Sequence, residues 1–328
     1  MLVNDELYGP CELNEPLLLD LLQTDAVGRL RGVYMGGVTS LLGIGTTSTR
    51  YEHSVGAMLL VRMLGASVEE QAAALLHDVS HTALSHVIDF VFDSPSRQAF
   101  HDDEKLRYAS ETQLPYVCER HHVDWQALLD EHQWPLLEQP PPRLCADRLD
   151  YGLRDAISLG LIPPTDAASI VAGLTVQEGR IIFANRQAAH RFAELYLACD
   201  AQCWSAAKSV VLYELTARAL RRALKIGVLE RKKLWISDQE LWRMLKSSTD
   251  SELQSQMQTI LDAAGSDVYA LDDAVPIVPK VRTVDPEVQT ENGLALLSDL
   301  DPLWAQKKRA YQESRVRQAG LVADPVDS

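Results

Sequence analysis

Residues 50–81 read RYEHSVGAMLLVRMLGASVEEQAAALLHDVSH and predict two helices in close succession. Apolar residues recur here at helical spacing, with Gly65 as the break. The pattern continues beyond this stretch, so that the predicted helices cover 51–66, 68–78, 82–93 and 99–120. Four helices so close in the chain predict a bundle, in which side chains from different helices meet in one site.

The flanking sequence is also largely helical. Helical spacing is present over 15–32, 143–159 and 186–226. The segment LTVQEGRIIFA (174–184) instead alternates around Glu178-Gly179, which predicts a small β-hairpin.

The pattern changes after about residue 235. Two short helices and a proline- and valine-rich stretch at 274–288 predict a minor lobe with irregular edge strands. We therefore predict a mainly α fold, with a helical core over 1–234 and a minor α+β lobe over 235–328.

Composition and charge exclude several classes of protein. The 328 residues carry 46 acidic and 31 basic side chains, a formal net charge of -15, which argues against nucleic acid as a partner. Five cysteines without a CxxC pair predict neither a disulfide framework nor a structural zinc site. The chain lacks an apolar run near the roughly 20 residues of a membrane span, and its start lacks the basic region of a signal peptide. We expect a cytoplasmic protein with no membrane partner.

Histidines are concentrated in the predicted bundle. Of nine in the chain, five lie in one region: His53, His77, His81, His86 and His101. A single histidine is more often a core residue, but the set favours a site. His77 is followed by Asp78, and imidazole nitrogen with carboxylate oxygen suits divalent metals that promote hydrolysis. A later predicted helix, which a bundle can bring close, carries Asp147, Asp150 and Asp155.

Three motifs follow one another in the chain: Arg50-Tyr51-Glu52-His53-Ser54; Leu76-His77-Asp78-Val79-Ser80-His81 with Ser85-His86; and Asp147-Arg148-Leu149-Asp150-Tyr151 with Arg154-Asp155. In this order they resemble the motifs of the HD-domain phosphohydrolases. They are most similar to the branch of deoxynucleoside triphosphate triphosphohydrolases that includes the SAM-and-HD-domain type. The similarity extends to Asn4-Asp5 with Gly9, Arg29-Leu30-Arg31, Gly36-Gly37 and residues 281–286.

The resemblance implies an HD-domain helical bundle that hydrolyses a nucleotide-like phosphoester. The family pattern makes four residues the metal ligands, namely His53, His77, Asp78 and Asp147. His81 matches a histidine close to the reacting phosphate, and His101 with Asp102 matches a His-acid pair that handles protons. With an ordinary pKa of about 6.5, such imidazoles donate or accept protons near neutral pH.

The resemblance also implies residues that bind substrate. Arg50 and His86 match phosphate contacts, and Arg148 matches a family lysine. Tyr151 matches a residue that lines the sugar, and Asp155 matches a carboxylate that accepts a hydrogen bond from a sugar hydroxyl.

The sequence departs from the family pattern in two places. Ile157 replaces a histidine, and residues 201–205, AQCWS, replace a tyrosine, a glutamine and basic residues. Trp204 still offers a ring for stacking on a base, but few cations remain for a distal phosphate, and Lys208, Arg218 or a partner subunit are the candidates to compensate. The sequence therefore predicts phosphoester hydrolysis more strongly than a triphosphate substrate.

Several alternatives remain at this stage. The order His53, His77-Asp78, His101, His121-His122, Asp147 also fits a dinuclear phosphodiesterase, although a single metal ion is favoured. A nucleotide monophosphatase and a non-catalytic module that binds nucleotide or metal are the other candidates. The ligand types admit Mn, Fe, Co, Ni, Zn or Mg. The expected partner is a small nucleotide or other phosphoester, and the resemblance implies a homo-oligomer.

Overall fold

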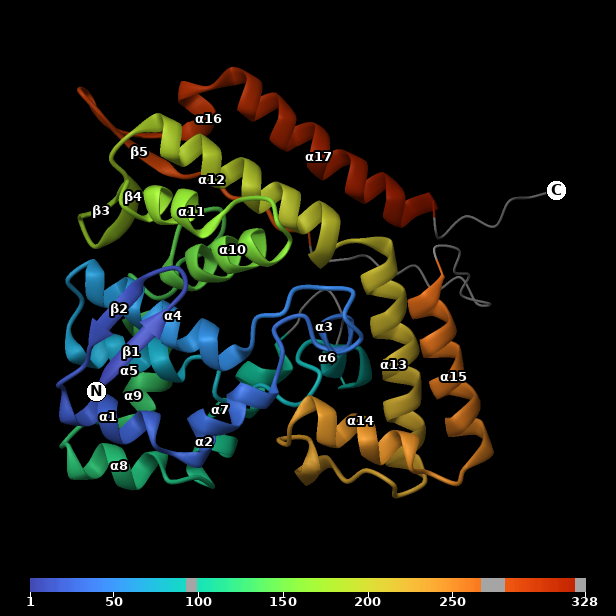
Figure 1. The fold of residues 1–328 in the computed structure, drawn as a ribbon. Helices are drawn as coiled ribbons and strands as arrows, with labels where there is room; N and C mark the ends of the chain where they lie inside the picture. Colours follow the sequence, from blue (N-terminus) through green and yellow to red (C-terminus); the bar gives the residue numbers. More distant parts are fainter. Residues whose placement is uncertain (93–98, 267–280, 322–328) are drawn as a thin grey trace.

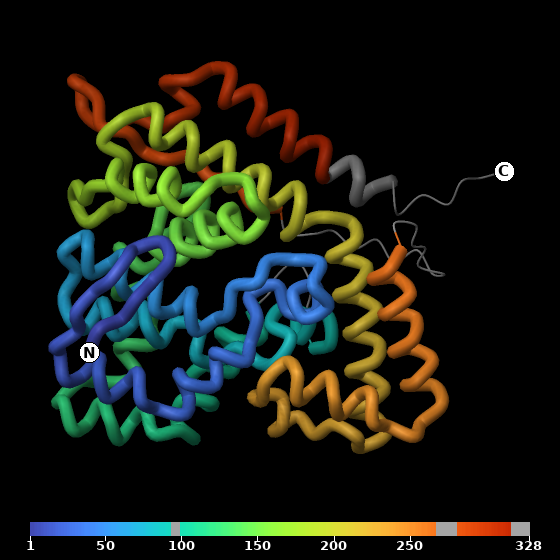
Figure 2. Tube along the Cα trace, viewed as in Figure 1, coloured from blue at the N-terminus to red at the C-terminus, as the bar shows by residue number. Residues whose placement is uncertain are grey.

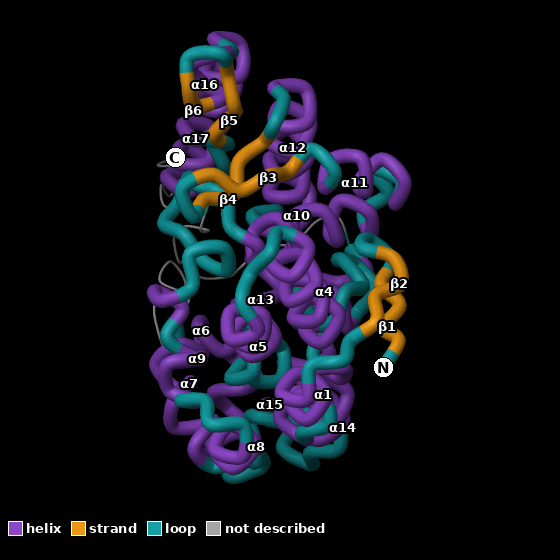
Figure 3. The backbone as a smooth tube through the Cα atoms, turned by 90° about the vertical axis from the view of Figure 1, so that its left-hand side faces the viewer, coloured by secondary structure: helices purple, strands orange, loops and turns teal. Residues whose placement is uncertain are grey.

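The computed structural model describes residues 1–92, 99–266 and 281–321. Helices dominate these ranges, and two small sheets lie at the periphery, which confirms the predicted mainly α class (Figure 1, Figure 3). In the described ranges, no helix combines the length and the apolar character needed to cross a membrane.

The structure sets the bounds of the elements as follows. The strands are β1 (Leu2–Asp5), β2 (Gly9–Glu12), β3 (Leu174–Gln177), β4 (Arg180–Phe183), β5 (Glu287–Thr290) and β6 (Gly293–Leu296). The helices are α1 (Pro16–Leu22), α2 (Asp25–Gly28), α3 (Val38–Leu41), α4 (Arg50–Met63), α5 (Val68–Leu76), α6 (Val87–Phe92), α7 (Phe100–Ser110), α8 (Leu114–Arg120), α9 (Trp125–Leu129), α10 (Ala146–Ser158), α11 (Pro164–Val171), α12 (Arg186–Cys199), α13 (Ala207–Lys225), α14 (Asp238–Lys246), α15 (Ser251–Gly265), α16 (Leu297–Leu300) and α17 (Pro302–Leu321). A π-helical turn, Asp200–Trp204, joins α12 to α13.

Helices α4 and α5 begin at side chains that cap them. The Thr49 hydroxyl accepts a hydrogen bond from the backbone N–H of Glu52, whose carboxylate accepts one from the N–H of Thr49, which forms a capping box. Ser67 caps α5 by accepting a hydrogen bond from the N–H of Glu70. These caps fix where both helices start, and their buried faces join α10 in the larger of two apolar cores.

Gly56 allows α10 to pack closely against α4. A Cβ atom at this position would lie 2.0 Å from Nη2 of Arg154 and 2.1 Å from Oδ1 of Asp150. Any other residue would therefore displace these two buried groups of α10. The close packing of the two helices brings Asp147 and Asp150 within reach of His53.

A second apolar core joins α13 to α6, α14 and α15 (Figure 1). It contains Leu212, Leu220, Leu241 and Leu253, all fully buried. Because α12 packs in the first core and α13 in the second, the π-helical turn between them connects the two cores.

The chain after residue 281 returns to the hairpin β3–β4. Strand β5 pairs with β4 in parallel at Phe183 and Val288, and β6 completes the four-stranded sheet. Helix α17 then lies along α12 (Figure 2), where Lys307 binds Glu194 at 2.7 Å. The boundary at residue 234 stays a prediction, and residues 274–280 of the predicted edge strands lie outside the described residues.

Four helices predicted as continuous are broken in the structure. The helix over 15–32 is interrupted at Thr24, whose side chain caps α2. The helix over 82–93 begins only at Val87, since Leu84 and Ser85 adopt positive φ angles of 62° and 48°. The helices over 99–120 and 186–226 break before α8 and α13. Hydrophobic spacing detects neither of the first two events, because the first depends on a capping side chain and the second on two left-handed residues; α8 and α13 begin after Gln113 and Ala206, whose side chains make no capping hydrogen bond.

Candidate metal centre and active site

Three helices bring the four predicted metal ligands together. His53 lies in the first turns of α4, His77 and Asp78 follow α5 directly, and Asp147 is in the first turn of α10. Nε2 of His53 lies 3.1 Å from Nε2 of His77 and 3.0 Å from Oδ1 of Asp147, and the latter two atoms are 3.5 Å apart. Oδ2 of Asp78 is 3.7 Å from Nε2 of His53. Four donor side chains thus face one small space.

The other ring nitrogens of the two histidines are already engaged. Nδ1 of His53 is 2.8 Å from Oδ2 of Asp150, and Nδ1 of His77 is 2.7 Å from the carbonyl oxygen of Ala74. When both rings are neutral these partners accept hydrogen bonds from Nδ1, and the Nε2 lone pairs then face each other across the shared space. Two lone pairs and a carboxylate at 3.0–3.5 Å fit a divalent cation between them.

Asp150 belongs to a buried chain of charges behind the site. Its Oδ2 accepts a hydrogen bond from Nε of Arg154 at 2.8 Å, and Nη2 of Arg154 reaches Asp5 at 2.7 Å on β1. All three side chains are buried. The N-terminal hairpin therefore supports the orientation of His53 through Arg154 and Asp150. From the sequence, Asp150 is expected only as an acid on a helix close to the site, and Arg154 and Asp5 only as parts of the family resemblance. The signal for the pairing of Asp150 with Arg154 is the Asp-x-x-x-Arg spacing, which puts both side chains on one face of α10.

The predicted ligands create a strongly negative pocket. Burial alone lowers the pKa of His53, but its hydrogen bonds to Asp147 and Asp150 and the charge of Asp78 outweigh burial and raise that pKa to about 10. The pKa of His77 is raised as well: burial lowers it, and Asp78 and Asp147 more than compensate. A site that holds extra protons so tightly also attracts a cation, which must displace them.

This competition predicts how metal stabilisation depends on pH. The raised pKa of His53 stabilises the metal-free fold fully below its unfolded value of about 6.5, and the stabilisation is lost as pH rises through about 10. Metal binding requires the deprotonated imidazole, so its affinity rises up to about tenfold per pH unit in this window. We expect the metal-induced rise in Tm to grow from pH 6.5 to pH 9, measured by thermal unfolding with and without Mn²⁺. A metal-induced rise in Tm that did not change with pH would contradict the displacement of a proton from His53 by the metal ion.

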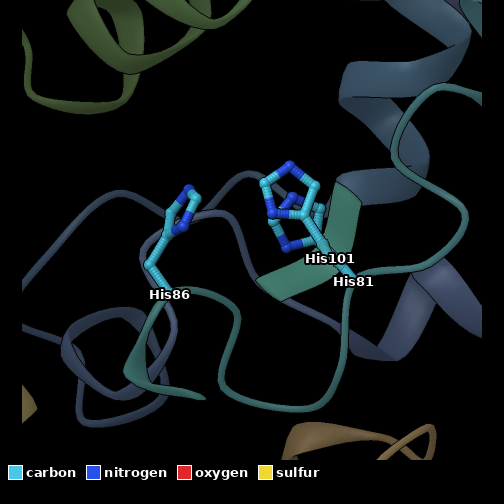
Figure 4. A group of neighbouring side chains, drawn as sticks. All are labelled: His81, His86 and His101. Atoms are coloured by element: carbon cyan, nitrogen blue, oxygen red, sulfur yellow. The ribbon is translucent and has the colours of Figure 1, made fainter. Parts of the chain in front are cut away.

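A second histidine cluster consists of His81, His86 and His101 (Figure 4), and Nε2 of His81 lies 3.2 Å from Oδ1 of the predicted ligand Asp78. His81 and His101 stack with ring centroids 3.8 Å apart and planes inclined by 19°, and His86 meets both rings edge-on. A metal ion bound by two imidazoles lies near the plane of each ring, and two stacked, nearly parallel planes do not share such a point. The stack therefore argues against a second ion held by His81 and His101 together.

These three histidines are neutral in the metal-free protein. Burial lowers the pKa of His81 well below its ordinary value, with Arg50 adding to the effect, and burial lowers the pKa of His86 and takes that of His101 to about 3. The expectation that His81 and His101 titrate near neutral pH is thus corrected. They accept protons readily only when an anion beside them offsets the cost of charging a buried ring.

A cavity of about 710 Å³ opens on both clusters. Of the predicted residues it is lined by Arg50, His77, Asp78, His81, His86, His101, Asp102, Asp147, Arg148 and Tyr151. Arg50 is buried and held by Oδ2 of Asp78 at 2.6 Å and Oγ of Ser85 at 2.9 Å. Arg148 binds Glu138 at 2.5 Å, and Asp102 binds Lys105 at 3.0 Å. Asp102 is 3.4 Å from Nε2 of His101, as the predicted His-acid pair requires.

A smaller cavity of about 90 Å³ adjoins the large one and is lined by Tyr151, Asp155 and Trp204. Nε1 of Trp204 donates to Oδ2 of Asp155 at 2.7 Å, and the rings of Trp204 and Tyr151 meet edge to face. The π-helical turn supplies Trp204. Burial raises the pKa of Asp155 to about 6, although Trp204 opposes this. Asp155, Trp204 and Tyr151, all three predicted to bind substrate, thus line one recess of aromatic rings and a carboxylate.

Other predicted residues lie elsewhere. His121, considered for a second metal, binds Asp20 on α1 at 2.8 Å, and His122 follows in the turn after α8. Arg218 binds Glu214 on its own helix, and neither Arg218 nor Lys208 is among the described residues that line the two cavities.

Comparison with known proteins decides the family. The HD-domain family model matches residues 50–154, the range from Arg50 to Arg154. The metal-dependent phosphohydrolase cns2 of Cordyceps militaris is 38% identical over 326 residues, which cover 97% of this chain and 94% of the relative. The chain belongs to the HD-domain metal-dependent phosphohydrolases. The uncharacterized protein YdhJ of Bacillus subtilis is 35% identical over 293 residues, which cover 88% of each of the two chains.

More distant similarities are found in one further sequence family member and in two solved structures. The deoxynucleoside triphosphate triphosphohydrolase SAMHD1 of Danio rerio is 28% identical over 48% of this chain and 33% of its own length. Among solved structures, a hypothetical protein of Aquifex aeolicus has a TM-score of 0.72 at 19% identity, covering 93% of both chains. A phosphohydrolase of Bacteroides thetaiotaomicron has a TM-score of 0.66 at 17% identity, covering 92% of this chain and 94% of its own. The HD fold thus spans nearly the whole phosphohydrolase chain.

Proposed function

We propose that the chain hydrolyses a nucleotide phosphoester at one divalent metal ion held by His53, His77, Asp78 and Asp147. The observation that carries this proposal is the convergence of these donors beside a 710 Å³ cavity, which is lined by three of them, His77, Asp78 and Asp147, and also by Arg50 and His86. A cavity of this size suits a nucleotide. The metal ion supplies Lewis-acid activation of the phosphoryl group and of the attacking water.

The surrounding residues bind the phosphate oxygens and transfer the proton of the attacking water. Arg50 and His86 offset negative charge on the phosphate oxygens. His81 and His101, neutral in the free protein, take up or pass on the proton of the attacking water, and Asp102 orients His101. The stack of the two rings keeps both imidazoles at the same wall of the cavity.

The nucleotide occupies the 710 Å³ cavity, and its sugar and the edge of its base reach the adjoining recess of Tyr151, Asp155 and Trp204. The aromatic rings pack against the sugar and base, while Asp155 accepts a hydrogen bond from a sugar hydroxyl. With the resemblance described above and the similarity to SAMHD1, a deoxynucleoside triphosphate is the first candidate substrate.

A nucleoside monophosphate is the second candidate. It is favoured by the π-helical turn, where residues 201–205 bring no basic side chain to the cavity and Ile157 stands in place of a histidine. Fewer cations on that wall suit a substrate with fewer phosphates.

A product screen tests both candidates. Metal-stripped protein is reloaded with Mn, Co, Ni, Fe, Zn or Mg and given deoxynucleoside triphosphates, ribonucleotides, monophosphates and cyclic dinucleotides, with Asp78→Ala as the blank. Nucleoside plus intact triphosphate is expected for the first candidate, and inorganic phosphate from monophosphates alone for the second. The absence of hydrolysis of every substrate with every metal ion would overturn the proposal.

A further inference from the structure

We propose that Arg282 binds the phosphoryl group of the substrate, so that the segment after residue 281 completes the active site. This inference rests on the proposed function, because it assigns one more contact to the same substrate. From the sequence, residues 281–286 are connected with function only by their similarity to the HD-domain family pattern.

Arg282 lies where the two cavities meet. Both the large cavity and the recess are lined by Arg282, and the lining residues common to both are Met35, Arg50, His86, Tyr151 and Arg282. A phosphoryl group between the metal centre and a sugar at the mouth of the recess lies at this junction. Arg282 is therefore placed beside the phosphoryl group of the substrate.

A phosphoryl group at this junction carries negative charge that the nearby arginines neutralise only in part. Arg50 is held by Asp78, and Arg148 is held by Glu138, so the charge of each is partly offset within the protein. Arg218 on α13 pairs with Glu214 and is not among the described residues that line the two cavities. A guanidinium has parallel N–H donors that match two phosphate oxygens, and Arg282 brings one from a part of the chain remote in sequence.

A set of polar contacts holds the Arg282 segment in place. The N–H of Asp285 donates to the carbonyl oxygen of Pro142 at 3.0 Å, and its carboxylate accepts hydrogen bonds from Ser298 and, at 2.5 Å, from Lys308 of α17. Gln312, one turn further along α17, donates to Oγ1 of Thr283 at 2.9 Å. Thr283 and Asp285, which both follow Arg282 closely in this segment, are thus fixed to α17.

Helix α17 is itself fixed to the π-helical turn. The Tyr311 hydroxyl donates to Oδ2 of the buried Asp200 at 2.7 Å, and Arg315 donates to the carbonyl oxygen of Ala201 at 3.0 Å. The turn that supplies Trp204 to the recess therefore also anchors the helix that positions Arg282. Tyr311, Lys308 and Asp285 act as positioning residues, while Arg282 contacts the substrate.

Binding of inorganic phosphate to Mn²⁺-loaded protein tests the inference without requiring the natural substrate. Arg282→Gln is expected to weaken phosphate binding at least about tenfold, and Arg282→Lys to weaken it several-fold, because lysine keeps the charge but loses the paired donors. Mn²⁺ content and Tm are measured on each variant. Arg186→Gln, an exposed arginine that pairs with Asp301 away from the cavities, is the matched control and is expected to bind phosphate as the parent protein does.

The outcomes separate this inference from the proposed function. If the parent protein binds phosphate and both Arg282 variants bind it equally well, the inference is wrong and the proposed function stands. If Arg282→Gln does not fold, Arg282→Lys decides: unchanged phosphate binding overturns the inference. A parent protein that neither binds phosphate nor hydrolyses any phosphoester overturns both.

Discussion

Asp147→Asn is expected to lower phosphoester hydrolysis at least about 1,000-fold, since metal activation contributes several kcal/mol and each 1.4 kcal/mol is a factor of ten. Asp147 is the most informative ligand to change because its side chain is 24% exposed and, within the described ranges, no ion pair joins it to an arginine, whereas Asp78 is also paired with buried Arg50. An amide is a poor metal ligand but keeps the shape of the carboxylate. The variant is expected to fold and to lose the metal-induced rise in Tm.

The control for this variant is Asp166→Asn. Asp166 is an exposed carboxylate in the first turn of α11, outside both cavities, and its replacement is expected to change neither rate nor metal binding. Turnover of Asp147→Asn within tenfold of the parent rate, with metal still bound, would rule out Asp147 as a ligand.

Asp150→Ala is expected to cost stability and metal affinity together. It leaves the buried guanidinium of Arg154 with Asp5 as its remaining carboxylate partner, and removing one member of a buried pair costs about 3–5 kcal/mol. It also removes the acceptor that orients His53, and loss of such a partner lowers metal affinity about 10–100-fold. Chemical denaturation of the metal-free protein and metal titration measure the two effects separately.

A triple variant distinguishes a general loss of packing from a loss of orientation at His53. In Asp150→Ala/Arg154→Met/Asp5→Asn neither the buried guanidinium nor the buried carboxylate of Asp5 is left as an unpaired charge, so part of the lost stability is expected to return while metal affinity stays low. If metal affinity recovered together with stability, Asp150 would have no specific role in orienting His53.

The site residues were more predictable from the sequence than the elements that position them. Imidazole carries ligand chemistry in the side chain itself, so the crowding of His53 and His77 with three further histidines indicates a shared site. Asp147 lies on a distant helix, and its role as a ligand is implied by the family resemblance. The support given by Asp5 to Arg154 depends on the N-terminal hairpin packing beside α10, and periodicity gives no sign of that contact.

Local geometry explains the remaining differences. The left-handed residues Leu84 and Ser85 delay α6 until Val87, which places His86 in a turn beside the stack rather than on a helix. Arg282 reaches the cavity because β5 pairs with β4 at Val288 and Phe183, a contact between distant parts of the chain. Hydrophobic spacing describes which face of an element is buried, but not which distant element covers it.

The most direct test of a single-metal phosphohydrolase is a metal titration followed by activity. Metal-stripped protein receives Mn²⁺ in sub-stoichiometric steps, and phosphoester hydrolysis is measured at each step. We predict no turnover without metal and a linear rise that ends at one ion per chain. Activity that survives complete metal removal, or a rise that continues to two ions per chain, would contradict the account.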